Sequence, residues 1–284
     1  MSMKRIYNIS LAWFASFILL FGGLSGCSQN ELLDTTDKAN SFELRASSAE
    51  YVTVALENAG TLAEKLGDKK ATTESLRLSG PFNAADMRCI REMSALKNLD
   101  MKDVKIVDSD ETYDNRKLEK DKIGAYCFSD LKLTTLVLPD NIIEIGEYAF
   151  QSTALVSITI PNTVKLIGNN AFYSCRSLVS VVLPNNLNKI AARLFCYCIA
   201  LESINVPSSV NVIESEAFSN CSSLISFDIP VGVATINDYT FSGCGSLMSI
   251  SIPNTVTAIG SRAFNKCIYN HRTTKTNQKY PSVN

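Results

Sequence analysis

Histidine is almost absent from this 284-residue sequence, and the single one, His271, lies close to the C-terminus. With its only imidazole in the tail, the chain is not expected to use a Ser-His-Asp or Cys-His catalytic group, nor a zinc site that needs histidine. The signatures G-x-G-x-x-G, G-x-x-x-x-G-K-[S/T] and H-E-x-x-H are also missing. We therefore expect no catalytic residue, no metal site and no cofactor, and we do not expect an enzyme.

An excess of one charge is missing as well. The chain has 27 Lys and Arg against 28 Asp and Glu, for a formal net charge of −1. A strongly basic balance would indicate a nucleic-acid partner, so we expect none. Between residues 123 and 267 the carboxylates are sparse and never recur as a facing pair, which leaves glycoside hydrolysis without an acid and a base.

What the sequence has in abundance is repetition, because Ile123 to Cys267 repeats every 22 or 23 residues. The repeated residues are Phe128, Phe150, Phe172, Phe195, Phe218, Phe241 and Phe264; Pro139, Pro161, Pro184, Pro207, Pro230 and Pro253; and Cys175, Cys198, Cys221, Cys244 and Cys267. A constant period of this length indicates a solenoid, in which each repeat packs only on its neighbours.

One repeat predicts a short strand, a turn and a return leg. Around Leu178 the apolar residues fall at offsets 0, 3, 5 and 9, and a proline follows the strand, which it ends because it has no N–H to donate. The return leg carries an isoleucine and then a phenylalanine, which we interpret as a plug pointing into the core. Gly146 follows that isoleucine in one repeat and Glu214 in another, so the slot requires no positive φ.

The pattern LxxLxLPxxΦ followed by IGxxAFxxCxxL resembles the BspA-like leucine-rich repeat family of bacterial surface proteins, over residues 122–267. The resemblance implies a right-handed leucine-rich repeat solenoid, β-rich, with short parallel strands along its inner face and a few short helices mainly in the N-terminal part. It also implies an adhesive role. The family's repeats often continue further, so this chain is either a short member or a truncated one.

The N-terminus predicts export. Residues 1–26 begin with Lys4 and Arg5, continue with an apolar run, and end at Leu24-Ser25-Gly26, directly before Cys27. This ending resembles the lipobox of bacterial lipoproteins, which implies that Cys27 becomes lipidated. A transmembrane anchor is the alternative, but the apolar run is shorter than the ~20 residues that a spanning helix needs. We expect a lipid anchor in the outer membrane of a Gram-negative bacterium, at the cell surface.

Two segments separate this signal from the repeats. Residues 27–50 are polar and predict a flexible tether; Asp34-Thr35-Thr36 within them resembles an O-glycosylation acceptor, with a bare linker as the alternative. Residues 51–107 predict an irregular N-terminal part that caps the solenoid, with one short helix over residues 61–67 and another capped by Asn83. The second helix would present Met87, Ile90 and Met93 on one face.

Polar residues interrupt the repeats once and follow them at the end. Residues 108–121 predict an inserted solvated loop; its acidic residues loosely resemble a calcium loop, without the turn glycine and the terminal glutamate. Residues 268–284 form a polar tail that is either a poor cap or a frayed end. We therefore expect Ile259 and Phe264 to lie at a partly open edge.

The cysteines of an exported protein suggest disulfides. Here Thr153 and Leu131 occupy the slot of the repeated cysteines in earlier repeats, so the slot accepts any small or apolar side chain. In parallel stacked turns the cysteine side chains of this column also point in the same direction, whereas a disulfide needs a specific Cβ–S–S–Cβ dihedral angle. We predict buried free thiols in this column, and an exposed thiol at Cys196, which departs from the pattern.

The strand face outside the core is the candidate binding surface. One column on it is nearly constant, with small residues such as Ser157 and Ser180. A second column varies, as expected of a surface that recognises a partner: Thr159, Val182, Asn205, Asp228 and Ser251. An ordinary solvated face is the alternative, and the scarcity of aromatic residues argues against stacking of sugars.

Two functional hypotheses follow. The first is a lipid-anchored surface module that binds a protein partner, such as a host matrix protein or another cell. The second is a structural or uptake-associated lipoprotein that scaffolds a complex or captures glycan.

Overall fold

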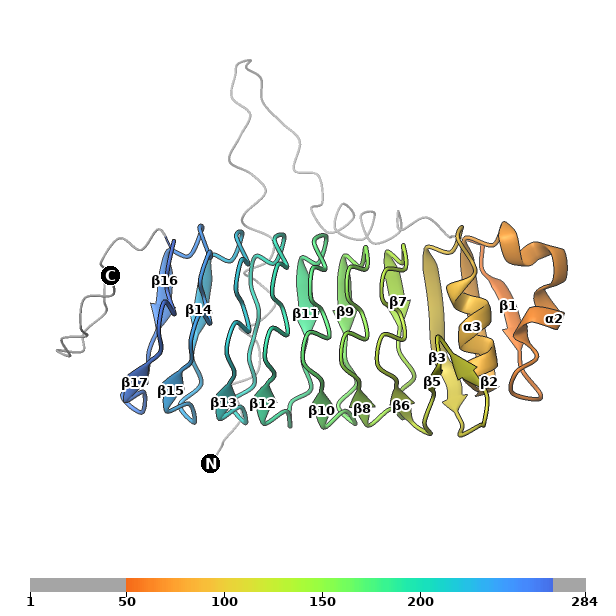
Figure 1. Ribbon diagram of the computed structural model, residues 1–284, viewed down its shortest axis with the longest axis horizontal. Helices are drawn as coiled ribbons and strands as arrows, with labels where there is room; N and C mark the ends of the chain where they lie inside the picture. Colours follow the sequence, from red (N-terminus) through yellow and green to blue (C-terminus); the bar gives the residue numbers. More distant parts are fainter. Residues whose placement is uncertain (1–49, 268–284) are drawn as a thin grey trace, which may run out of the picture. The chain divides into compact units, whose positions relative to one another are not determined.

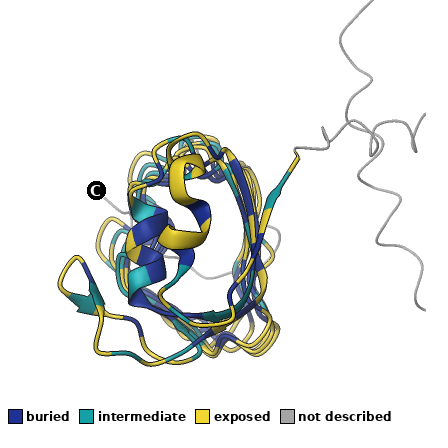
Figure 2. Ribbon diagram, turned by 90° about the vertical axis from the view of Figure 1, so that its right-hand side faces the viewer, coloured by how far each residue is buried: buried dark blue, intermediate teal, exposed yellow. Residues whose placement is uncertain are grey.

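Each apolar frame predicted from the sequence forms one turn of a solenoid. The computed structural model describes residues 50–267, all within one compact unit, and they wind through about nine turns (Figure 1). Viewed along the axis, the turns lie one behind another around a buried interior (Figure 2). The β-rich solenoid with short parallel strands and two short α-helices is confirmed.

One side of the solenoid is a column of parallel strands. β1 (Val52–Ala55), β2 (Ser75–Phe82), β3 (Asn98–Ile106) and β7 (Thr135–Val137) form a four-stranded sheet in that order. The column continues with β9 (Ser157–Thr159), β11 (Ser180–Val182), β14 (Ser226–Asp228) and β16 (Ser249–Ser251). The central residue of β9, β11 and β14 is buried between two exposed ones, as the offsets predict. Between β11 and β14, the turn at Leu201 keeps that leucine buried without a regular strand.

A second column of two-residue parallel strands follows the proline turns. Its members are β6 (Lys122–Ile123), β8 (Glu144–Ile145), β10 (Leu166–Ile167), β12 (Lys189–Ile190), β13 (Val212–Ile213), β15 (Thr235–Ile236) and β17 (Ala258–Ile259). The predicted return-leg isoleucine ends each strand. The glycine that follows it has no positive φ, as expected; at Gly146 a Cβ would lie 2.5 Å from the backbone nitrogen of Ala125. Close approach of two turns therefore explains this glycine.

The third side contains the phenylalanine plugs. The six from Phe128 to Phe241 are fully buried, and Phe264 in the last described turn is half-buried. Neighbouring rings stack with centroids 4.9–5.6 Å apart. The prediction of inward plugs is confirmed, and the half-buried Phe264 agrees with the expected open edge.

Backbone hydrogen bonds between turns on this third side all run in one direction. In each turn the phenylalanine N–H, and the N–H groups two residues before and after it, donate to carbonyls of the next turn. In the first such row Tyr126, Phe128 and Asp130 donate to Glu147, Ala149 and Gln151 over 2.7–3.0 Å. The flanking residues adopt left-handed φ, which accounts for 13 of the 16 non-glycine residues with positive φ. We call this array the corner ladder.

Two helices cover the N-terminal turns. α2 (Leu62–Leu66) is followed by the 3₁₀ helix η1 (Gly67–Ala71), and α3 (Ala84–Arg91) begins at Asn83. Asn83 and Asp86 form a capping box, and buried Asp86 also accepts hydrogen bonds from the N–H groups of Gly60 and Leu62. The helix capped by Asn83 is confirmed. Met87 and Ile90 are buried on it, and Met93, also buried, lies just beyond its end at Arg91.

The prediction of a simple solvated loop over residues 108–121 was wrong. The segment forms an antiparallel hairpin, β4 (Thr112–Tyr113) with β5 (Arg116–Lys117), and Tyr113 and Leu118 are buried. The polar composition concealed these two core residues. In the described part of the chain no three metal-ligating side chains gather, so the weak resemblance to a calcium loop finds no support.

The hairpin closes the N-terminal end of the corner ladder. The Tyr113 hydroxyl donates to the Ala125 carbonyl at 2.8 Å. The Arg91 guanidinium from α3 donates to the carbonyls of Cys127 and Ser129 at 3.2 and 3.3 Å, and the Asp114 carboxylate pairs with it at 2.7 Å. Three carbonyls that have no preceding row of the corner ladder to donate to them are thereby satisfied.

Replacing Phe195 with alanine should lower the free energy of unfolding by ~3–5 kcal/mol, because a fully buried ring between Phe172 and Phe218 leaves a cavity. Thermal or denaturant unfolding measures the change. Val231→Ala is the control, since Val231 is 68% exposed and should lose little. An unchanged melting midpoint for the Phe195 variant would contradict the role of the plug.

Candidate interaction surface

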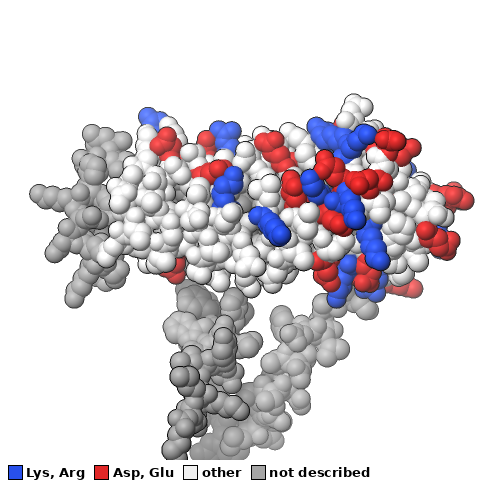
Figure 3. All heavy atoms as spheres, turned by 90° about the horizontal axis from the view of Figure 1, so that it is seen from below, with Lys and Arg blue, Asp and Glu red and all other residues white. Residues whose placement is uncertain are grey.

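Charge is distributed unevenly along the solenoid. Residues 50–154 contain 14 Lys and Arg and 19 Asp and Glu, whereas residues 155–267 contain six and five. Figure 3, which shows one face of the solenoid, has the charged side chains crowded over the N-terminal turns and fewer of them toward the other end, mainly along one edge. The C-terminal turns therefore present a surface that costs little to desolvate, as the centre of a protein interface requires.

The predicted binding residues form one exposed column on these turns. Thr159 lies beside Val182 in the pairing of β9 with β11, and Asp228 lies beside Ser251 in that of β14 with β16. Asn205 is exposed at the equivalent position of the turn between them. The small column lies parallel to it and is exposed too: Ser157, Ser180, Ser203, Ser226 and Ser249.

A third column was missed by the sequence reasoning. It stands directly before the serines and consists of Val156, Val179, Ile225 and Met248, which are 38–69% exposed. We call it the aliphatic column. It was overlooked because the offsets 0, 3, 5 and 9 track residues that enter the core, whereas these side chains fall at offset 1. The sequence did contain a signal for this column, because an apolar residue recurs at offset 1, which is not one of the offsets that enter the core.

The three columns together form the strand face. Over its C-terminal turns, Glu202 and Asp228 are the charged residues in these columns. Backbone hydrogen bonds of 2.9 Å join the Val179 N–H to the Val156 carbonyl and the Met248 N–H to the Ile225 carbonyl. Glu202 stands between these two pairs, and its carbonyl accepts from the Ile225 N–H at 3.1 Å. The exposed side chains are therefore held in fixed register by the sheet beneath them. Such an ordered apolar stripe is typical of an interaction surface.

The repeated cysteines contribute to the core rather than to this surface. Cys175, Cys198, Cys221 and Cys244 are buried and unbonded, which confirms the prediction of free thiols. The thiol of Cys221 donates to the Phe195 carbonyl at 3.1 Å, and its neighbours do likewise with the equivalent carbonyls. Cys196 was predicted to be exposed, and this was wrong: it is 2% exposed. Its backbone lies in the corner ladder, where its carbonyl accepts from the Ser174 N–H at 2.8 Å.

Burial controls the ionisation of these thiols. It raises the pKa of Cys175 from 9.0 to about 11, and those of Cys198 and Cys221 further. Since the thiolate is the reactive form, we expect the buried thiols of Cys175, Cys198 and Cys221 to react slowly in the folded chain. These cysteines are structural, and no nucleophile is poised among them.

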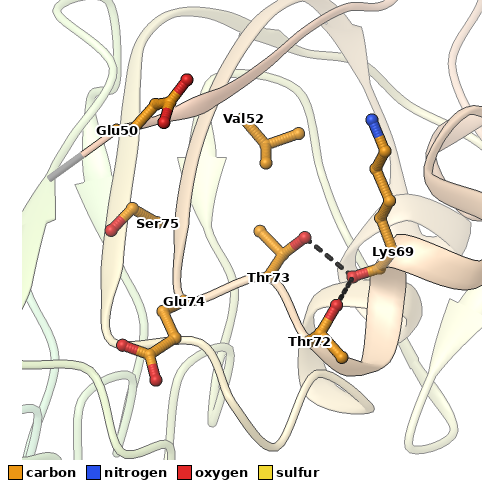
Figure 4. Close-up of a pocket in the computed structure, with 7 residues that line it drawn as sticks. All are labelled: Glu50, Val52, Lys69, Thr72, Thr73, Glu74 and Ser75. Carbon is orange, nitrogen blue, oxygen red and sulfur yellow. Dashed lines mark hydrogen bonds between the residues drawn. The ribbon is translucent and has the colours of Figure 1, made fainter.

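One surface depression of the described residues can be compared with the requirements of a catalytic site. It has a volume of about 430 Å³, lies beside β1 and is drawn in Figure 4. Its hydroxyl groups on Thr72 and Thr73 both donate to the Lys69 carbonyl, and the side chains of Glu50, Glu74 and Lys69 point apart. No nucleophile paired with a base is present among its lining residues.

Other predicted features lie outside the described residues. Cys27, the signal segment, most of the tether, the Asp34-Thr35-Thr36 acceptor, His271 and the tail from residue 268 are among them. Within residues 50–267, no helix is long and apolar enough to cross a membrane.

A family model matches most of the repeat region. It is described as a BspA type leucine rich repeat region and matches residues 114–225 and 213–281, in six copies. This chain belongs to the BspA-type leucine-rich repeat family. A search of curated proteins finds no match. Repeat proteins of this kind are non-enzymatic and generally mediate protein interactions.

Solved structures of other bacterial leucine-rich repeat proteins are similar to this BspA-type chain. The protein TpLRR of T. pallidum is 31% identical over 55% of this chain and 73% of its own, with a TM-score of 0.50. A leucine-rich repeat protein of Bacteroides ovatus is 21% identical over 70% of this chain and 66% of its own, with a TM-score of 0.38. A leucine rich cell surface protein of Faecalibacterium prausnitzii is 24% identical over 68% and 65%, also with a TM-score of 0.38.

Thiol labelling tests the cysteine column. In the native chain Cys198 and Cys221 should resist iodoacetamide, half-buried Cys267 should react first, and all should react in denaturant, as read by mass spectrometry. Rapid native labelling of Cys221 would contradict this packing.

The free energy of unfolding should fall as pH rises from about 9 towards 11, because the unfolded chain releases its thiol protons at a lower pH than the folded chain does.

Proposed function

We propose that this BspA-type protein is a lipid-anchored surface module that binds a protein partner along the strand face. The observation that supports the proposal is the ordered aliphatic column on turns that carry few charges. Burying its four side chains on a partner removes apolar surface from water and leaves few charges to desolvate. The partner would present a complementary, weakly polar surface, such as that of a host matrix protein or a protein on another cell.

The proposed partner is a protein rather than a glycan. Sugar binding commonly uses exposed aromatic faces, and the described strand face offers serine, threonine and aliphatic side chains instead. The half-buried aromatic pair Tyr126 and Tyr148 stacks at 4.8 Å on the corner side of the solenoid, away from the strand face. We infer a binding role without catalysis, as in the family.

Binding through the strand face can be tested with two matched substitutions. Val182→Glu places a charge on the strand face, and Val212→Glu places the same charge in β13, on the second column; the two valines are 57% and 40% exposed. With immobilised basement-membrane extract as the probe, Val182→Glu should weaken binding by at least about tenfold, since the charge must be desolvated. Val212→Glu should bind like the original chain. Equal binding by all three chains would contradict the strand face as the contact.

The anchor and its orientation are tested in cells. Cys27→Ala should release the protein from membranes, because the acyl chains that would hold it there attach to that thiol. Proteinase treatment of intact cells should remove the anchored protein. Continued membrane fractionation of the variant would count against lipidation. Full protection from the proteinase would place the protein in the periplasm and favour a scaffold or an uptake component.

A further inference from the structure

The corner ladder makes the two ends of the solenoid chemically different. Each of its six rows donates three N–H groups to the following turn at 2.7–3.1 Å, and none of these bonds runs the other way. The first row consequently exposes carbonyls and the last row exposes N–H groups. Aligned backbone N–H groups of this kind attract acceptors and negative charge.

At the N-terminal end the chain supplies the missing donors itself. Tyr113 and Arg91 donate to the carbonyls of Ala125, Cys127 and Ser129, as described above. Two separate elements, the hairpin β4–β5 and α3, provide these side chains. The fold thus contains side chains whose hydrogen bonds satisfy the carbonyls at the N-terminal end of the corner ladder.

The C-terminal end has no equivalent among residues 50–267. The N–H groups of Arg262, Phe264 and Lys266 occupy the donating positions of the last row, and no described residue accepts from them. Apolar groups are also left half-covered there, including Ile259 and the ring of Phe264. Among the described residues, three backbone N–H donors and a half-covered apolar edge therefore lie together at the C-terminal end of the solenoid.

We propose that this end binds an acidic, extended segment of a partner protein, which adds to the solenoid as a further turn. Its carbonyls would accept from Arg262, Phe264 and Lys266, as in strand addition at the edge of a sheet. An existing pair indicates the charge: Arg193 occupies the column of Arg262, and its guanidinium pairs with Glu216 of the next turn at 2.7 Å. In the free chain the Arg262 guanidinium donates instead to the Tyr239 hydroxyl of the preceding turn at 3.3 Å, so binding would turn it toward the added segment. A glutamate in the added segment would pair with Arg262 in the same way.

A second copy of this chain fits the end poorly. Two copies meeting through a two-fold axis would bring N–H groups against N–H groups in the corner ladder. Head-to-tail stacking would need the carbonyls of Ala125 and Cys127, which already accept from Tyr113 and Arg91. Residues 268–284 contain three basic and no acidic residues, so they offer no carboxylate side chain to Arg262 or Lys266.

The test uses the full chain in detergent micelles and a synthetic peptide of residues 209–224, which contains Glu216 and Phe218, with Cys221 replaced by serine. In the free chain the Phe264 amide should exchange with deuterium at least about 100-fold faster than the Phe241 amide, which is bonded to the next turn. Adding the peptide should slow exchange at Phe264 and leave Phe241 unchanged.

Reversing the charges of the proposed ion pair between Arg262 and the glutamate of the peptide supplies the matched control. Arg262→Glu should weaken binding of the dye-labelled peptide by at least about tenfold, and a peptide carrying Glu216→Arg should restore it. Val182→Glu, on the strand face, should not change this affinity, so the result is independent of the proposed function. Protection of Phe264 in the free chain equal to that of Phe241 would overturn the proposal, because the end would already be covered. Unchanged affinity of the Arg262 variant would overturn it as well.

Discussion

The structure depends on hydrogen bonds between neighbouring turns. A strand of two or three residues has no stability of its own, and the left-handed residues of the corner ladder are individually unfavourable. Both persist because the turn before and the turn after hold them, while the stacked phenylalanines keep water away from the bonds. Stability is therefore a property of adjacent turns, as expected for a solenoid.

The parts of the fold that were predicted correctly are those set by a repeated core residue. Phe195, Ile190 and Leu178 recur with one period and are buried in every full turn, so the period identified the solenoid and its strands. Tyr113 and Leu118 were missed because each occurs once, inside a charged segment. A unique contact between distant segments, such as Arg91 with the carbonyls of residues 127 and 129, leaves no periodic trace in the sequence.

The candidate surface was predicted in part. The variable column from Thr159 to Ser251 was located correctly as an exposed column, because strand alternation fixes which side faces outward. The aliphatic column was missed because an apolar residue in a repeat is normally assigned to the core. Its exposure becomes apparent only from the backbone, because the order of residue types does not show which apolar residues lie outside the core.

The closed N-terminal end has a consequence for how such proteins change in length. Because the hairpin and α3 satisfy the first row once, whole turns can be gained or lost further along without rebuilding that end. Each additional turn would lengthen the strand face by ~4.8 Å and contribute one more small, one variable and one exposed apolar position. Duplication or deletion of a single repeat could thus adjust the reach of the surface while every existing contact keeps its register.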